Sequence, residues 1–309
     1  MAAMSLAARV GRVMLENPVV AASGTFGFGP EYAPHVDMTK LGGIAVKGVS
    51  PTPWPGNPPP RVWETPAGLL NSIGLQNPGV ERFVADDLPF LNRMGIPVIV
   101  NIIGHTPEEY AAVARRLDRE AGIAALEVNI SCPNIKEGGM VFGHDPGAAR
   151  EVTAAVVGAT RLPVWVKLSP NTDRLLAVAE AAREGGASAL TAINTVVGMA
   201  IDLERRRPAL GGVTGGLSGP AIRPIGVRAV YELYRAVPLP IVGIGGIETA
   251  RDALEYILAG ARAVMVGTAT FGRPDAMETI VAALPSALKQ LGFASLDEAV
   301  GAAHDSRRA

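Results

Sequence analysis

One segment of the chain reads Ala124-Ala125-Leu126-Glu127-Val128-Asn129-Ile130-Ser131-Cys132-Pro133-Asn134. Its first part, Ala124–Ile130, is mostly apolar and leads directly to Ser131 and to Cys132, which is the only cysteine of the chain. Small and branched residues without strict alternation are typical of a parallel strand that is buried on both faces. Pro133 directly follows the cysteine and stops the strand there. The run therefore predicts a buried strand whose carboxyl end presents a thiol between two asparagines.

Similar short apolar runs recur along the 309 residues, and helical patterns lie between them. The other expected strands are Pro18–Ala22, Ile44–Val46, Val98–Val100, Val164–Leu168, Ala189–Ile193, Ile241–Ile244 and Ala263–Val266. The expected helices are Thr106–Arg119, Asp145–Gly158, Thr172–Glu184, Pro220–Ala236, Glu248–Ala259 and Pro274–Leu291. Eight strands that alternate with helices predict an α/β fold, a (β/α)8 TIM barrel in a single domain over residues 1–309. A doubly wound open sheet is the alternative for the same alternation.

Two long connections interrupt this rhythm, Ser50–Val80 and Val196–Gly219. In a barrel, insertions of this kind fall on strand-to-helix loops over the active face. The second insertion contains the charged run Glu204–Arg207, which we interpret as a solvated loop face because the rest of the chain is not basic.

The overall composition excludes several classes of protein. A net charge of −1 argues against a nucleic-acid platform. One cysteine rules out an internal disulfide and a metal or iron–sulfur site built from cysteines of this chain alone, and it fits a reducing compartment such as the cytoplasm. We find no signal peptide and no apolar stretch long enough to span a membrane.

Polar residues stand at most of the expected strand ends, which lie on one rim of a barrel. They include Lys47, Asn101, Asn129, Lys167 and Asn194. Amides and ammonium groups in this arrangement suit a polar, planar, anionic ligand. For the two lysines, three interpretations remain open: salt bridges at the barrel mouth, charge stabilisation beside a flavin, or Schiff-base chemistry at Lys167.

Glycines mark the last two expected strand ends, in Gly243-Ile244-Gly245-Gly246 and in Gly267-Thr268. Glycine lets backbone amides approach a phosphate closely, and barrels often bind phosphate after strands 7 and 8. The first motif alone is more often an ordinary turn than a phosphate site, but the pair of motifs favours a phosphate site.

Cys132 is either a small buried hydrophobe or a catalytic group. The four histidines, His35, His105, His144 and His304, show no pairing spacing with it. This absence favours a thiolate that accepts a proton over a histidine-activated nucleophile.

Together these motifs resemble the class 1 dihydroorotate dehydrogenases, and the B type in particular. The resemblance extends from Asn17 to about Pro285. It rests on the segments Ala21–Gly29, Glu64–Pro66, Asn71–Gly79, Asn129–Asn134, Val166–Pro170, Ile193–Thr195, Gly215–Pro220 and Gly243–Gly246.

The resemblance implies a barrel that binds FMN and oxidises dihydroorotate to orotate in pyrimidine synthesis. It implies that FMN is held by Ser23, Lys47, Gly48, Asn101, Asn129, Lys167, Ile193, Gly219, Gly245, Gly246, Gly267 and Thr268. It implies that the substrate is held by Lys47, Asn71, Ser72, Ile73, Gly74, Leu75, Asn129, Asn134, Asn194 and Thr195. Cys132 would be the general base, and no metal is implied.

The B type passes electrons to NAD through a partner subunit that carries FAD and a 2Fe-2S cluster. The resemblance therefore implies a homodimer within a heterotetramer, in the cytoplasm, without membrane or nucleic-acid contacts. The alternatives are an A-type enzyme that uses fumarate, another FMN barrel that acts on pyrimidines such as a dihydrouridine synthase, a Schiff-base lyase that uses Lys167, and a catalytically silent barrel that only binds a phosphorylated ligand.

Overall fold

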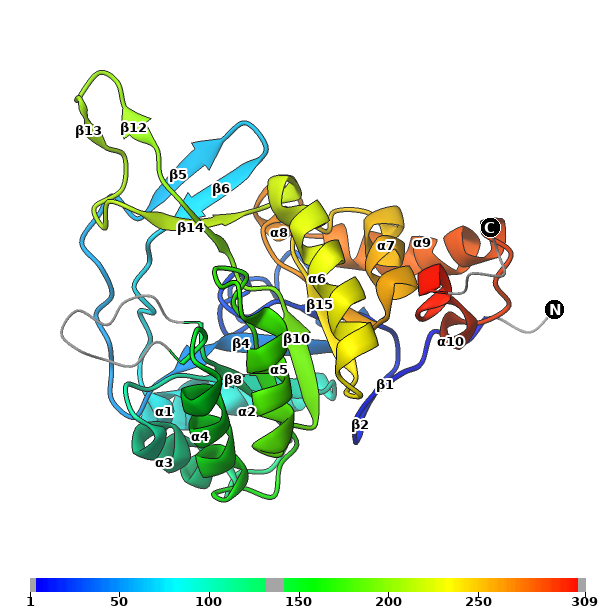
Figure 1. Ribbon diagram of the computed structural model, residues 1–309, viewed down its shortest axis with the longest axis horizontal. Helices are drawn as coiled ribbons and strands as arrows, with labels where there is room; N and C mark the ends of the chain where they lie inside the picture. The colour runs from blue at the N-terminus through cyan, green and yellow to red at the C-terminus, as the bar shows by residue number, and fades with distance from the viewer. Residues whose placement is uncertain (1–3, 132–141, 305–309) are drawn as a thin grey trace.

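Eight parallel strands close into a barrel in the computed structural model, which describes residues 4–131 and 142–304 (Figure 1). The order around the barrel is β10-β15-β16-β3-β4-β7-β8-β9. The strands are β3 (Val19–Ala21), β4 (Gly43–Val49), β7 (Val98–Ile102), β8 (Ile123–Asn129), β9 (Val164–Lys167), β10 (Ala189–Ala192), β15 (Ile241–Ile244) and β16 (Ala261–Val266). Each predicted strand is confirmed, and closure of the sheet excludes the open-sheet alternative.

A ring of helices surrounds the barrel, and neighbouring helices pack against one another in chain order. The ring consists of η2 (Phe83–Asp87) with α1 (Val80–Arg82) and α2 (Leu88–Met94), then α3 (Pro107–Leu117), α4 (Pro146–Val157), α5 (Leu175–Glu184), α6 (Arg223–Ala236), α7 (Ala250–Ala259) and α9 (Ala276–Gln290). Side-chain oxygens of Thr106, Asp145 and Thr249 cap three of these helices. The six predicted helices are confirmed to within a few residues at their ends.

The two insertions pair with each other, which the sequence analysis did not predict. Strands β5 (Val62–Thr65) and β6 (Gly68–Asn71) come from the first insertion, and β11 (Val196–Gly198) and β14 (Gly215–Ser218) come from the second. They form one antiparallel sheet in the order β11-β14-β6-β5. This sheet stands beside the barrel in Figure 1, next to a projecting hairpin of β12 (Ile201–Asp202) and β13 (Arg207–Pro208). The run Glu204–Arg207 forms the exposed tip of that hairpin, as expected of a solvated face.

Smaller elements complete the fold. They are the hairpin β1 (Ala8–Val10) and β2 (Val13–Leu15), the short helices η1 (Met38–Lys40), η3 (Pro220–Ile222), α8 (Ala269–Gly272) and α10 (Leu296–Ala299), and the final turn η4 (Ala302–His304). Within the described ranges 4–131 and 142–304, no helix is both long and apolar enough to span a membrane.

Strand register decides which polar side chains meet inside the barrel. Asn101 on β7 lies opposite Glu127 on β8, and Asn129 on β8 lies opposite Lys167 on β9. Because side chains alternate along a strand, Glu127 and Asn129 share one face of β8, and Leu126 and Val128 share the other. The register therefore places four polar side chains from three neighbouring strands on the inner face of the barrel, toward the carboxyl ends of the strands.

Candidate active site

A cavity of about 390 Å³ opens at the carboxyl ends of the barrel strands, between the barrel and the antiparallel sheet. Thirteen of the residues predicted to bind cofactor or substrate line this cavity, and most of them carry an amide, hydroxyl or ammonium group. They include Ser23, Lys47, Gly48, Asn101, Asn129, Lys167 and Asn194, and the loop after β6 contributes Asn71, Ser72 and Leu75. Ile73, Gly74 and Thr195 line it as well.

A second, smaller cavity of about 80 Å³ continues the first. The remaining predicted cofactor residues line it, namely Ile193, Gly219, Gly245, Gly246, Gly267 and Thr268. Ser23, Lys167 and Asn194 line both cavities. The structure thus brings the predicted residues together in one elongated site with a glycine-rich end and an amide-rich end. Cys132 and Asn134 lie outside the described residues.

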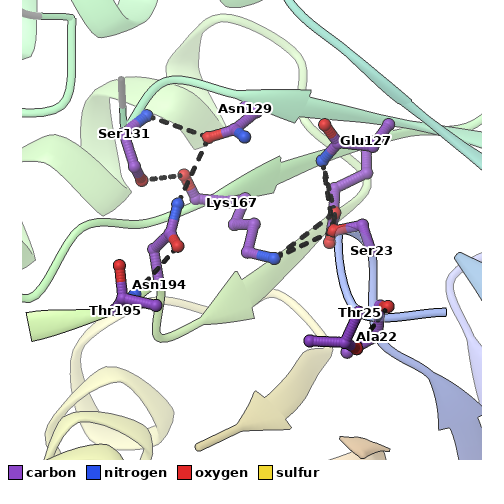
Figure 2. A network of polar contacts seen from close by, with 10 residues as sticks. Ala22, Ser23, Thr25, Glu127, Asn129, Ser131, Lys167, Asn194 and Thr195 are labelled. Atoms are coloured by element: carbon purple, nitrogen blue, oxygen red, sulfur yellow. Dashed lines mark hydrogen bonds and ion pairs between the residues drawn. The ribbon is translucent and has the colours of Figure 1, made fainter. Parts of the chain in front are cut away.

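The junction of the two cavities is a buried polar cluster that centres on Lys167 (Figure 2). The Lys167 ammonium donates to Ser23 Oγ at 3.0 Å and lies 3.8 Å from Glu127 Oε1. The same carboxylate oxygen accepts hydrogen bonds from Ser23 Oγ at 2.8 Å and from Asn101 Nδ2 at 2.6 Å. The Lys167 side chain is 6% exposed and that of Glu127 is fully buried. These contacts fix the ammonium at the base of the site.

Glu127 belongs to this cluster, and the sequence analysis did not identify it. It interrupts the apolar run at Ala124–Ile130, and a lone carboxylate within a strand that is otherwise buried was the available signal. Ser131, Asn171 and Ser218 also line the larger cavity and were not predicted.

The amide end of the site is held by hydrogen bonds to the backbone and between side chains. Tyr110 donates to the Asn129 carbonyl at 2.7 Å, at the point where β8 ends. Asn129 Oδ1 accepts from the Ser131 N–H at 3.2 Å and from Asn194 Nδ2 at 3.4 Å, as Figure 2 shows. Ser131 Oγ donates to the Lys167 carbonyl at 3.1 Å, which ties the end of β8 to the end of β9. Two amide side chains therefore reach the cavity from fixed positions.

Lys47 lines the larger cavity from β4. Burial lowers the pKa of its ammonium below the ordinary value of 10.5, the Glu31 carboxylate opposes this shift, and Arg61 adds to it. A partly desolvated cation in an amide-lined cavity suits a ligand that carries a carboxylate.

Backbone conformation shapes the glycine end of the site. Gly245 and Gly246 have φ of +130° and +64°, and a Cβ on Gly246 would stand 2.7 Å from the Gly219 carbonyl oxygen. The Tyr256 hydroxyl donates to the Gly245 carbonyl at 2.7 Å and so fixes this turn. Burial of Tyr256 raises the pKa of its hydroxyl. The Thr268 hydroxyl donates to Ser218 Oγ at 2.8 Å, and both residues line the smaller cavity. Gly219, Gly245 and Gly246 all line the smaller cavity, so their backbone can contact a bound group such as a phosphate directly.

A further hollow of about 430 Å³ lies at the amino-terminal ends of the strands. Its lining includes Arg12, Asp118 and Arg161, and the Arg161 side chain is 87% exposed and paired with Asp118 at 3.1 Å. This hollow is an open surface groove with ordinary ion pairs, and it contains none of the predicted site residues. In the described part of the chain, no group of three or more His, Cys, Asp or Glu side chains could hold a metal ion.

Comparison with known proteins is consistent with this geometry. The family model described as "Dihydroorotate dehydrogenase" matches residues 5–288. A protein of Desulforudis audaxviator named "Dihydroorotate dehydrogenase B (NAD(+)), catalytic subunit" is 56% identical over 298 residues, which cover 96% of this chain and 97% of that protein. A protein of the same name from Desulforamulus reducens is 53% identical over 97% of this chain and 99% of its own length.

A solved structure shares the fold. It is described as "Crystal structure of DHODH in complex with ferulenol from Eimeria tenella", with a TM-score of 0.80 and 23% identity over 97% of this chain and 89% of that chain. At this identity the likeness concerns the fold alone, whereas the family match covers most of the sequence. The chain therefore belongs to the dihydroorotate dehydrogenase family.

Proposed function

We propose that this chain oxidises dihydroorotate to orotate with FMN, as the catalytic subunit of an NAD-linked enzyme of pyrimidine synthesis. Family membership supports the reaction, and the name shared by the curated relatives supports the B type. The observation that carries the proposal is the joined site, in which the buried Lys167 ammonium separates a glycine-rich pocket from an amide-rich cavity.

The residues of the glycine-rich pocket fit the phosphate and ribityl end of FMN. Gly219 and Gly246 face each other so closely that a Cβ on Gly246 would meet the Gly219 carbonyl. Gly267 and Thr268 line the same pocket from the next strand. Backbone amides and one hydroxyl would hold the phosphate, and Ser23, Asn101 and Lys167 would contact the ring system at the junction.

The residues of the larger cavity fit a pyrimidine that carries a carboxylate. The amides of Asn71, Asn129 and Asn194 offer both donors and acceptors, which match the alternating N–H and C=O groups of the ring. Lys47 would pair with the carboxylate, and the loop Ser72–Leu75 would close one side of the ring. Asn134 is proposed to contribute as well and lies outside the described residues.

The chemistry requires two hydrogens to leave neighbouring carbons. When bound, FMN supplies the acceptor for the hydride from carbon 6. Carbon 5 lies next to a carbonyl, and we assign the removal of its proton to the Cys132 thiolate. Lys167 would stabilise negative charge at the base of the site.

Lys167 is not arranged as a Schiff-base nucleophile. Its ammonium donates to Ser23 and forms an ion pair with Glu127, whereas a Schiff-base lysine acts as a neutral amine. The lyase alternative therefore has no support in the geometry, and family membership favours the oxidoreductase.

Electron transfer to NAD would require a second subunit. The chain has one cysteine, so the FAD and 2Fe-2S groups of a B-type enzyme would reside on a partner. We further propose that residues 1–309 act as a single FMN-binding barrel domain, in a homodimer within a heterotetramer in the cytoplasm.

Acceptor specificity tests this assignment. Orotate formation by the purified chain should proceed with an artificial dye acceptor, and it should proceed with NAD only after the partner subunit is added. Turnover with fumarate as the sole acceptor would instead identify an A-type enzyme.

Substitution of Gly246 by alanine should abolish FMN binding. The change places a methyl group 2.7 Å from the Gly219 carbonyl and strains a backbone at φ +64°. The matched control is Gly95→Ala, because Gly95 has φ of +68° and open space around its Cβ position. Flavin content after purification should fall to near zero in the first variant and stay at the wild-type level in the second; equal content in both would contradict the assigned phosphate pocket.

Substrate affinity should weaken at alkaline pH through Lys47. Because burial lowers the pKa of its ammonium, the charge that attracts the carboxylate is lost at a lower pH than for an ordinary lysine. The KM for dihydroorotate should therefore rise as the pH increases through this titration. Lys47→Met should raise KM by about 10–100-fold at neutral pH and remove the alkaline rise; an unchanged pH profile of KM in this variant would exclude Lys47 as the carboxylate partner.

A further inference from the structure

Glu127 places a carboxylate inside the barrel, beneath the junction of the two cavities. Its side chain is fully buried. The adjacent residues on β8, Leu126 and Val128, face the opposite way and are buried in the apolar layer outside the barrel. Burying an ionised group without partners is costly, so the groups around it indicate what it does. All of these groups come from other strands or strand ends.

The partners of Glu127 converge on one of its two oxygens. Oε1 accepts from the Ser23 hydroxyl at 2.8 Å and from the Asn101 amide at 2.6 Å, and the Lys167 ammonium is 3.8 Å away. Every neighbour offers hydrogen to it, which is the environment that suits an ionised carboxylate. Oε2 has no hydrogen-bond partner among the described residues.

The Ser23 hydroxyl lies between Glu127 and Lys167 and forms a hydrogen bond with each of them. Ser23 has one proton to donate, and it gives this proton to Glu127 while accepting from the Lys167 ammonium at 3.0 Å. The direction of both hydrogen bonds therefore depends on the carboxylate. Figure 2 shows the contacts that join Lys167, Ser23 and Glu127.

A buried ion pair is in general weak evidence for a contribution to stability. An apolar side chain of similar volume generally packs in such a place at no loss of stability, provided that the partner charge is also removed. The presence of the carboxylate is therefore explained by the groups around it. These groups belong to Ser23, Asn101 and Lys167, and all three residues line the larger cavity.

We propose that Glu127 is a positioning residue, which orients the Ser23 hydroxyl and the Asn101 amide and compensates the charge of Lys167 beside the flavin ring. This inference rests on the proposed function only insofar as the site binds FMN. Glu127 does not itself touch the substrate. Its negative charge offsets the ammonium and thereby keeps the bound flavin harder to reduce than Lys167 alone would make it.

The reduction potential of the bound flavin tests this role, because a structural role would not shift it in a defined direction. Glu127→Gln keeps the shape and the acceptor oxygen but removes the negative charge. The remaining ammonium then favours the flavin that has gained electrons, so the potential should become more positive. We expect at least a tenfold change in the equilibrium constant of reduction, which is about 30 mV for a two-electron couple.

The measurement is an anaerobic titration against reference dyes with a chemical reductant and without dihydroorotate. The outcome is therefore independent of the substrate assignment. If the wild-type protein did not turn over dihydroorotate, the proposed function would be refuted, but the measurement of the flavin potential would still test the role of Glu127. Glu120→Gln is the matched control, since Glu120 follows the end of α3 and lines the hollow at the amino-terminal ends of the strands, so that loss of its charge should leave the potential unchanged. An unchanged or more negative potential in Glu127→Gln would overturn the proposal.

The double variant Glu127→Gln/Lys167→Met decides the matter if Glu127→Gln alone does not hold flavin. Lys167→Met by itself leaves the carboxylate buried without its cation and should lower the denaturation midpoint. The double variant removes both charges, so its midpoint should return most of the way to the wild-type value. A double variant that unfolds as early as Lys167→Met would show that the carboxylate does not compensate the ammonium.

Discussion

Cys132→Ala slows the reduction of the bound flavin by dihydroorotate by about 10²–10⁴-fold, while FMN stays bound. This is the expected result if the thiolate removes the proton from carbon 5, because a methyl group cannot accept it. The residue itself lies outside the described part of the chain, but Ser131, to which it is joined, lines the cavity and ties β8 to β9. Stopped-flow absorbance at saturating dihydroorotate measures the rate directly.

The pH dependence provides the control for this variant. An ordinary cysteine thiol titrates at about pH 8.5, so flavin reduction in the wild type should speed up as the pH rises toward this value. The acceleration should disappear in Cys132→Ala, and Cys132→Ser should be intermediate in rate because a hydroxyl is a much weaker base. Reduction of Cys132→Ala at near the wild-type rate would exclude the thiol as the base.

Lys167→Met should lower both the stability of the protein and its affinity for FMN. The variant leaves Glu127 buried at 0% exposure without its nearest cation, and breaking a buried ion pair in this way costs about 3–5 kcal/mol of unfolding free energy. The site also loses the ammonium that lies at the junction of its two cavities. Urea denaturation of the flavin-free protein measures the first effect, and fluorescence titration with FMN measures the second.

Lys289→Met is the matched control for Lys167→Met. Lys289 lies in the last turn of α9, where its side chain is exposed, so this variant removes the same group at a site with little electrostatic cost. It should retain wild-type stability and FMN affinity. A Lys167→Met protein with the denaturation midpoint and the FMN affinity of Lys289→Met would contradict the assigned cluster.

The barrel was predictable because its strands carry a local signal. Runs such as Val164–Leu168 and Ile241–Ile244 are continuous and apolar, as parallel strands with two covered faces must be. The carboxyl ends of those strands necessarily meet at one rim. Lys167, Asn101 and the glycines Gly245 and Gly246 could therefore be assigned to one site before their contacts were known.

The antiparallel sheet over the site carried no comparable signal. Its strands are three or four residues long, and β6 pairs with β14, whose register joins Leu70 to Leu217 across the chain. Such pairing depends on contacts between distant segments, which no local pattern encodes. The sheet appeared in the sequence only as two long insertions.

Glu127 escaped prediction for a different reason. Its sequence neighbours are apolar because they face the helices, and only alternation within β8 turns the carboxylate toward Asn101 and Lys167. The sequence pattern marks the strand but not which polar groups of other strands will face it. The partners of a buried charge became visible only with the closed barrel.

The most direct test of the proposed reaction is an anaerobic absorbance spectrum of the purified chain before and after addition of dihydroorotate. An oxidised flavin band at about 450 nm, as FMN enzymes show, should be present at first and should bleach on addition. That result would establish cofactor and substrate in one measurement. A flavin band that persists in the presence of dihydroorotate, or a chain that binds no flavin even after reconstitution with FMN, would contradict the account.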